Sequence, residues 1–225
     1  MKVIPEIERI ACGSVNCFIV SQEGGAVLVD TGTAKHRDNI LDKCRAAHVR
    51  LILITHGHYD HAQNAAYLAR QLNIPIAMHS ADIPLLKGLD PGAVQAHSGA
   101  GKLMVLVMKL AARPVTGKMI SRLQNSEIPP FAPDIALRDG DSLEEYGVGA
   151  TVIALPGHTM GSVGLKIGDS GLLVGDALFN VLRPQKAVHY LDRAAMEQSA
   201  QRISGCGDTA VIHFGHGKPV TNRNW

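Results

Sequence analysis

The sequence predicts an α+β fold in which layers of β-sheet are covered on their outer faces by helices. Short runs rich in Val, Ile and Leu recur in both halves of the chain, which is typical of buried or half-buried strands. Segments with helical spacing of apolar residues also occur in both halves. Because every sheet must bury its apolar faces, helices spread through both halves indicate stacked sheets with helices outside.

The first half of the chain contains the strands and helices that precede the first candidate site. Gly24 and Gly25 mark the turn between the second and third strands, and Ile40, Leu41 and Cys44 have helical spacing. The predicted strands are 3–10, 17–20, 26–30, 51–55 and 74–78, and the predicted helices are 38–47 and 62–72. The β-branched run 51–55 is predicted to be a buried strand.

The second half repeats this style with short strands separated by Gly or Asp-Gly, which favour tight connections. The predicted strands are 135–137, 142–146, 151–155, 163–167, 172–174 and 210–213, and the predicted helix is 194–203. Both halves therefore contribute strands and at least one helix, as the layered fold requires.

A different segment, residues 82–133, separates the two halves and is predicted to be a helical insertion into a single domain, 1–225. Its middle, residues 102–113, is apolar on nearly every face, so a helix there must be covered by something. Three interpretations remain open: a lid over an acyl-bearing substrate, packing on the core, or a homodimer interface. The basic residues of the segment could meet an anionic head group or a membrane surface; they are Lys102, Lys109, Arg113, Lys118 and Arg122.

Composition bounds the class of protein and its partners. A chain of 225 residues with 46% hydrophobic and 19% charged residues is typical of one globular domain. The net charge of +2 and the aromatic content of 4% do not favour nucleic acid as a partner. No apolar run approaches the roughly 20 residues that a membrane span needs.

The cysteines and the first residues predict a cytoplasmic location. Residues 1–6 lack the apolar core of a signal peptide. The four cysteines, Cys12, Cys17, Cys44 and Cys206, contain no C-x-x-C spacing and are predicted to be reduced, mostly buried thiols.

The most informative stretch is His56-Gly57-His58-Tyr59-Asp60-His61, which places three histidines and an aspartate within six residues. Imidazole and carboxylate are ligands that zinc and similar metals prefer, and four of them are enough for parts of two metal sites. With this histidine content, a chance match to such a pattern has odds of roughly one in a thousand. The stretch follows the strand 51–55, so it lies at a strand's carboxyl end, where open α/β sheets place their sites.

Three further candidates each follow a strand in a turn framed by glycine. They are His158 in Pro156-Gly157-His158-Thr159, Asp176 after Gly175, and His216 between Gly215 and Gly217. Glycine lets the backbone bend closely around a bound ion. A single histidine in a turn is more often structural, but the common placement at strand ends favours metal ligation for all three.

The order of these blocks, together with Val29-Asp30-Thr31-Gly32, resembles the metallo-β-lactamase superfamily over about residues 26–218, with 82–133 outside the match. The resemblance implies a four-layer αβ/βα sandwich with two divalent metals at one edge. It implies that Asp176 bridges the metals and that Asp30 supports the ligand loops. The implied ligands are His56, His58 and His158 for the first metal, and Asp60, His61 and His216 for the second.

The implied activity is hydrolysis of an ester-like bond, such as a thioester or lactone, in a small-molecule substrate, by a water that the metals activate. Zinc is the expected metal, with iron or manganese as alternatives. Asp60 and Asp176 are the predicted catalytic residues, and Asp60 would orient the water or carry its proton.

Glyoxalase-II-like and lactonase-like members are the nearest type, but the sequence departs from true glyoxalase II in two places. Residues 177–184 lack the G-C-G-R run that those enzymes carry, and the chain ends soon after Gly217 without their glutathione-binding C-terminal part. The best-known β-lactamase class uses a Cys ligand in the second site, and no Cys occupies a motif position here.

Two other functions use the same motifs. One is a mononuclear-iron dioxygenase of the persulfide-dioxygenase type, and the other is a non-catalytic binding protein, which would usually have lost ligands. His189 and Tyr190, just before the last helix, are predicted either to point at the site or to face solvent.

Overall fold

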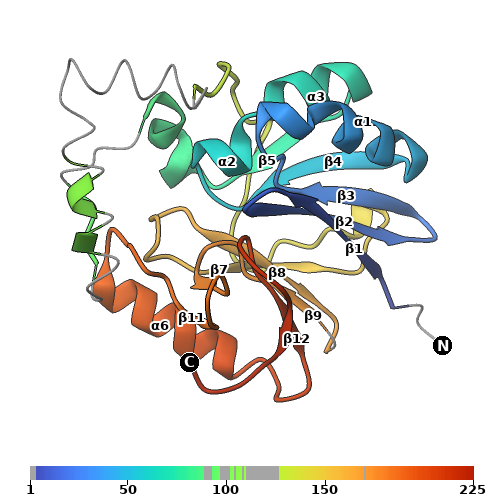
Figure 1. Ribbon diagram of the computed structural model, residues 1–225. Coiled ribbons are helices and arrows are strands. Elements are labelled where there is room, and N and C mark those ends of the chain that lie inside the picture. The colour runs from blue at the N-terminus through green and yellow to red at the C-terminus, as the bar shows by residue number, and fades with distance from the viewer. Residues whose placement is uncertain are drawn as a thin grey trace.

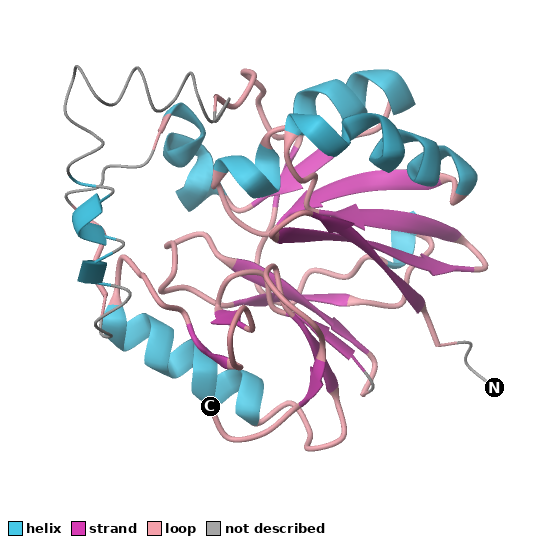
Figure 2. Ribbon diagram, in the orientation of Figure 1, coloured by secondary structure: helices cyan, strands magenta, loops and turns pink. Residues whose placement is uncertain are grey.

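The computed structural model describes residues 4–88, 93–96, 102–103, 105–107, 109, 127–169 and 171–225. Two sheets pack face to face, and helices cover the outer face of each (Figure 1). Colouring by secondary structure makes the four layers visible, with strands in the middle and helices above and below (Figure 2). The α+β sandwich predicted from the sequence is confirmed.

The first sheet contains six strands in the order of the sequence. They are β1 (Glu6–Cys12), β2 (Val15–Gln22), β3 (Gly25–Val29), β4 (Val49–Ile54), β5 (Ile76–Met78) and β6 (Ile135–Ala136). The first three pair antiparallel, whereas β3 to β6 pair parallel. The carboxyl ends of the parallel strands therefore meet at one edge, and residues 56–61 follow β4 at that edge.

The second sheet has the order β13-β12-β9-β8-β7. Its strands are β7 (Thr151–Ala154), β8 (Val163–Ile167), β9 (Gly171–Leu173), β12 (Val211–His213) and β13 (Val220–Thr221), and a separate hairpin joins β10 (Leu178–Phe179) to β11 (Gln185–Lys186). The pairings make β7, β9 and β12 run in the same direction. The loops that leave their carboxyl ends, which carry the three remaining candidate ligands, therefore lie at one edge.

Alternation along the strands divides the apolar side chains between the layers. In the first sheet, Leu28 and Ile52 pack toward α1 (Arg37–Ala46) and α3 (Ala65–Leu72). Their neighbours Val27 and Leu51 face the second sheet and form the central core with its strands. A third cluster lies between the second sheet and α6 (Arg193–Ser204), whose N-cap residue Asp192 accepts a hydrogen bond from the Ala195 N–H at 3.0 Å.

The predicted helix 62–72 is divided in the structure. A short helix α2 (Tyr59–Ala62) precedes α3, and Gln63 and Asn64 separate the two. The Asn64 amide donates to the carbonyls of Thr31 and Thr33 at 2.7 and 2.8 Å. The Asn64 backbone N–H donates to the Thr31 hydroxyl at 3.2 Å and not to the carbonyl four residues earlier, so the helical hydrogen bonding stops where α2 and α3 meet.

The prediction of a strand at 142–146 is wrong. Residues Glu144–Tyr146 form the 3-10 helix η3, and only Ser142 pairs with Thr151 as an isolated bridge. Gly147 ends the turn at φ 81°, and a Cβ there would lie 2.1 Å from the carbonyl carbon of Gly24. Hydrogen bonds from the N–H groups of Tyr146 and Gly147 to the carbonyls of Leu143 and Glu144, at 3.0 and 2.9 Å, close the turn in place of strand pairing.

The predicted insertion is described only in part, so the single domain with an inserted segment stays a prediction. The predicted segment begins within the 3-10 helix η2 (Ser80–Lys87). Further along, Gln95 forms an isolated antiparallel bridge with Tyr190. Residues 102–103, 105–107 and 109 are helical, with Val105 buried and Leu103 63% exposed. Lys102 and Lys109 are exposed, whereas Arg113, Lys118 and Arg122 lie outside the described residues. In the part of the chain that the structure describes, no helix has both the length and the apolar character to cross a membrane.

Candidate metal centre

All seven predicted ligands come together at the edge of the sandwich where the two sheets present their strand ends. The ligand atoms form two groups, and within each group all atoms lie within 4.8 Å of one another. The first group is His56, His58, His158 and Asp176, and the second is Asp60, His61 and His216. Ligands from both halves of the sequence are thus combined in a single cluster.

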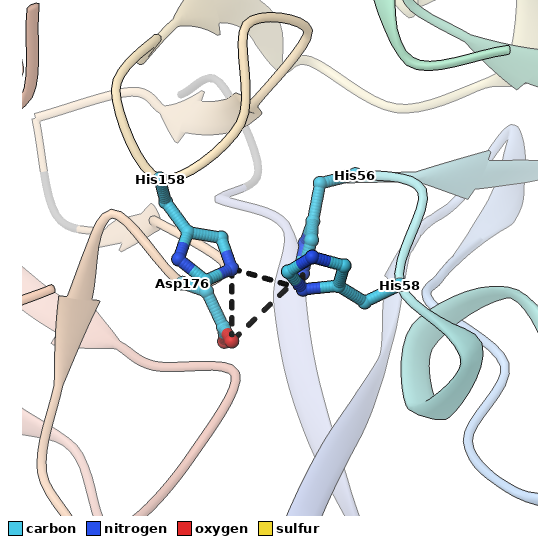
Figure 3. A group of neighbouring side chains, drawn as sticks. All are labelled: His56, His58, His158 and Asp176. Carbon is cyan, nitrogen blue, oxygen red and sulfur yellow. Dashed lines mark hydrogen bonds and ion pairs between the residues drawn. The ribbon is translucent and has the colours of Figure 1, made fainter. Parts of the chain in front are cut away.

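The four side chains of the first group point toward one another (Figure 3). The Nδ1 atom of His58 lies 3.1 Å from the Nε2 atoms of both His56 and His158. The Oδ2 atom of Asp176 lies 3.8 Å from His56 Nε2 and 3.6 Å from His158 Nε2. Metal–nitrogen distances of about 2.0–2.1 Å place tetrahedral ligands roughly 3.4 Å apart, so these side chains fit one cation between them.

The second group is connected to the first through Asp176. His216 Nε2 lies 3.4 Å from Asp176 Oδ2 and 3.5 Å from Asp60 Oδ2. His61 Nε2 lies 3.4 Å from the other oxygen of Asp176, Oδ1. One carboxylate therefore contacts the histidines of both groups, as expected of a bridging ligand.

Hydrogen bonds on the far side of three imidazole rings direct the ligand nitrogen inward. The Nδ1–H groups of His61, His158 and His216 donate to Asp30 Oδ2, the His189 carbonyl and the Ser14 carbonyl, at 2.7, 3.0 and 2.7 Å. Since Nδ1 carries the proton in each neutral ring, Nε2 keeps its lone pair. That tautomer is the one a metal requires.

Asp30 organises the loop that carries the first ligand. Its Oδ1 accepts from the Thr55 N–H at 2.8 Å, and its Oδ2 accepts from the Thr55 hydroxyl at 2.8 Å. The hydroxyl can then accept from the Nδ1–H of His56, 3.1 Å away. Together with its bond to His61, this places Asp30 against ligands of both groups, as the resemblance implied.

Two buried ligand atoms leave a position that a cation can fill. His61 Nε2 and Asp176 Oδ1 lie 3.4 Å apart, and neither makes a well-aligned hydrogen bond among the described residues. Buried polar atoms are nearly always satisfied, and a cation held between these two atoms would satisfy both. Gly215 keeps this space open, because a Cβ there would lie 2.3 Å from Asp176 Oδ1.

The two groups differ in their electrostatics. Burial lowers the pKa of His58 to about 3 and lowers the pKa values of His56 and His158 well below the ordinary range. These rings are therefore neutral at physiological pH, with lone pairs available.

In the second group, carboxylates outweigh the effect of burial. Burial alone would lower the pKa of His61, but Asp176, Asp30 and Asp60 raise it well above the usual value. Burial alone would raise the pKa of Asp176, but His216 and His61 hold it well below its usual value. Protons are therefore stronger competitors for a metal in the second group than in the first.

One supporting residue, Asn16, was not predicted from the sequence. The Asn16 amide donates to the Phe214 and Gly217 carbonyls at 3.0 and 2.8 Å, and so holds the His216 loop against the β1–β2 hairpin. No local signal could have identified Asn16, because its partners lie about 200 residues away in the sequence. Of the two orientations that the sequence left open for His189, the structure has the first: its ring stacks on His58 with centroids 6.0 Å apart, so it faces the site.

The chain belongs to the metallo-beta-lactamase superfamily, whose family model matches residues 10–216. An uncharacterized protein of Mycobacterium bovis is 27% identical, over 94% of this chain and 88% of its own. The probable metallo-hydrolase YflN of Bacillus subtilis is 22% identical, over 91% of this chain and 80% of its own. The hydroxyacylglutathione hydrolase of Photobacterium profundum is 27% identical, over 88% of this chain but only 60% of its own.

Solved structures agree with this assignment. TTHA1623, solved in a di-iron-bound form, matches with a TM-score of 0.67 and 26% identity, over 97% of this chain and 94% of its own. The B3 metallo-beta-lactamase BLEG-1 matches with a TM-score of 0.69 and 22% identity, over 96% of this chain and 94% of its own. ETHE1 from Myxococcus xanthus matches with a TM-score of 0.61 and 16% identity, over 97% of this chain and 80% of its own. The last two likenesses show the fold, and the predicted family is confirmed.

Proposed function

We propose that this protein is a hydrolase that uses two divalent metal ions to cleave an ester-like bond in a small, acyl-bearing molecule. The observation that carries the proposal is the position of Asp176, whose two oxygens face histidines of both ligand groups at 3.4 to 3.8 Å. A carboxylate between two sets of imidazoles is the arrangement that a pair of cations requires.

The residues divide between two cations. The first would be held by His56, His58 and His158, the second by Asp60, His61 and His216, and both by Asp176. Bound divalent metals supply Lewis acidity, which lowers the pKa of a coordinated water from about 15.7 to about 7. Imidazole and carboxylate ligands favour zinc, and the di-iron form of TTHA1623 supports iron as the alternative to it.

Asp60 is the better placed of the two predicted catalytic carboxylates to exchange a proton. Its side chain is 20% exposed, whereas that of Asp176 is 4% exposed. Asp60 can therefore orient the attacking water and pass its proton toward solvent. Asp176, buried among histidines, holds its position and contributes negative charge to both groups.

Apolar side chains next to the ligands favour an acyl-bearing substrate. Tyr59 follows His58 directly, and Met160 lies two residues after His158; they are 37% and 48% exposed. Val181 and Leu182, 65% and 94% exposed, follow β10, where the Phe179 ring stacks on His216 at 5.3 Å. Exposed apolar groups that neighbour the ligands along the chain are available to contact an apolar part of a substrate.

One relative supports hydrolysis of an acyl compound. It is a hydroxyacylglutathione hydrolase, 60% of which this chain covers, and its name is consistent with this reaction class. Residues 177–184 nevertheless lack the G-C-G-R run of glyoxalase II, so a different acyl compound is expected. A cytoplasmic location and a homodimer stay predictions.

The experiment is a metal assay of purified protein, followed by a panel of acyl thioesters, lactones, phosphodiesters and β-lactams. Two metal ions per chain with turnover of a thioester or lactone is the expected result. One iron per chain with oxygen uptake on a persulfide would contradict the proposal and establish the dioxygenase alternative.

A further inference from the structure

A buried carboxylate that is not among the seven ligands joins two of the ligand loops. Asp82, in η2, is fully buried. Its Oδ2 accepts from the Gly57 N–H at 2.9 Å and from the Thr159 hydroxyl at 2.6 Å, and its Oδ1 accepts from the Gly161 N–H at 2.6 Å. Gly57 lies between His56 and His58, whereas Thr159 and Gly161 follow His158. Every one of these donors therefore belongs to a loop that carries ligands of the first group.

The two glycines provide the room for this contact. A Cβ at Gly161 would lie 2.7 Å from both Cγ and Oδ1 of Asp82, and a Cβ at Gly57 would lie 2.8 Å from the Asp82 carbonyl oxygen. Neither glycine has a positive φ. Glycine is therefore needed at both positions because η2 approaches closely, and not because the backbone of Gly57 or Gly161 excludes other residues.

Asp82 also connects parts of the chain that are distant in sequence. The His56–His58 loop leaves β4 in the first sheet, and the His158 loop leaves β7 in the second. A carboxylate that accepts from both loops limits the distance between His58 and His158, whose nitrogens lie 3.1 Å apart. A metal site tolerates errors of only about 0.2 Å in ligand position, so such a connection matters for affinity.

We propose that Asp82 is a positioning residue that sets the spacing of the first metal's ligands by tying the two loops together. The proposal rests on the metal centre proposed above. Asp82 touches neither metal nor substrate, and it acts through the backbone of Gly57 and Gly161 and the hydroxyl of Thr159.

The test is Asp82→Asn, measured by titrating metal-free protein with cobalt(II) and recording its visible absorption. An amide has one acceptor oxygen, so it must turn its NH₂ toward at least one backbone N–H that the carboxylate now accepts. We expect the first cobalt equivalent to bind about 10- to 100-fold more weakly, with an altered absorption band, while the circular dichroism stays that of the wild type. Wild-type cobalt affinity and spectrum in this variant would overturn the proposal.

Matched variants separate positioning from general destabilisation. Asp134→Asn is the control for loss of a carboxylate that accepts a backbone bond: Asp134, which is more exposed than Asp82, accepts from the Ile76 N–H at 2.8 Å, and its hydrogen bonds go to β5 and not to a ligand loop. It should bind cobalt as the wild type does, and a loss equal to that of Asp82→Asn would overturn the assigned role.

Thr159 supplies a milder test in case Asp82→Asn does not fold. Thr159→Val removes one donor to Asp82 with little change in volume and should lower the cobalt affinity of the first site several-fold. Thr159→Ser keeps the hydroxyl and should bind cobalt with the wild-type affinity. Unchanged cobalt affinity in a folded Thr159→Val variant would overturn the proposal. Failure of the wild type to bind cobalt would instead overturn the metal centre itself, and this proposal with it.

Discussion

Gly215→Ala offers a direct test of the metal centre, because a single methyl group would enter the space between the two ligand groups. A Cβ at Gly215 would lie 2.3 Å from Asp176 Oδ1 and 2.8 Å from His61 Cε1. The backbone of Gly215 does not have a positive φ, so alanine is permitted there by conformation. Any loss of function would therefore come from the contact alone.

The size of the effect follows from the distances. An ordinary contact between carbon and oxygen is about 3.4 Å, so Asp176 or the Gly215 loop must move by roughly 1 Å. Metal ligands tolerate only about 0.2 Å, and a misplacement of about 1 Å near a reacting centre can cost about 100-fold in rate. We expect Gly215→Ala to lose about 100-fold in kcat/KM and to retain less than two metals per chain.

The assay compares metal content and turnover of Gly215→Ala with those of Gly205→Ala. Gly205, at the end of α6, has φ −76°, and its Cβ would meet nothing closer than the Arg202 carbonyl oxygen at 3.6 Å. The control should therefore behave as the wild type. If Gly215→Ala kept two metals and wild-type turnover, the placement of Asp176 between two cations would be refuted.

Three further predictions concern metal binding and stability. Asp176→Ala should abolish both metal occupancy and turnover, and elemental analysis showing two retained metals in an active variant would contradict the bridging role. Removal of metal by a chelator should lower the unfolding temperature. If the free metal concentration had been about 1,000 times its Kd, the free energy of unfolding should decrease by about 4 kcal/mol. Calorimetry that detects no shift would count against a resident metal. Burial lowers the pKa of His213 to about 4 from 6.5, so the unfolded state binds the proton first as the pH falls, and the free energy of unfolding should decrease between pH 6.5 and pH 4 by on the order of 3 kcal/mol. Urea unfolding across this range should show a shallower pH dependence for His213→Gln than for the wild type, and equal slopes would argue against a buried, neutral His213.

The pattern of strands and helices could be predicted largely from the sequence, because apolar periodicity and glycine turns are local signals. The errors came from contacts between distant segments. The predicted helix 62–72 is interrupted at Asn64, whose backbone N–H and side-chain amide both donate to the loop after β3. Residues 144–146 form a 3-10 turn in place of the predicted strand, and Gly147, which ends this turn, packs against Gly24.

The types of ligand were determined by the sequence alone, since residues 56–61 combine imidazole and carboxylate at a strand's carboxyl end and His158, Asp176 and His216 follow other strands. Their arrangement was decided by the tertiary structure. The parallel course of β7, β9 and β12 brings the last three ligands to one edge, and the packing of the two sheets brings that edge to residues 56–61. The supporting contacts of Asn16 and Asp82 also depend on the packed fold, because each joins loops that are far apart in the sequence. Metal chemistry is a property of individual side chains, whereas the distances that make a site out of them exist only once the sheets have packed.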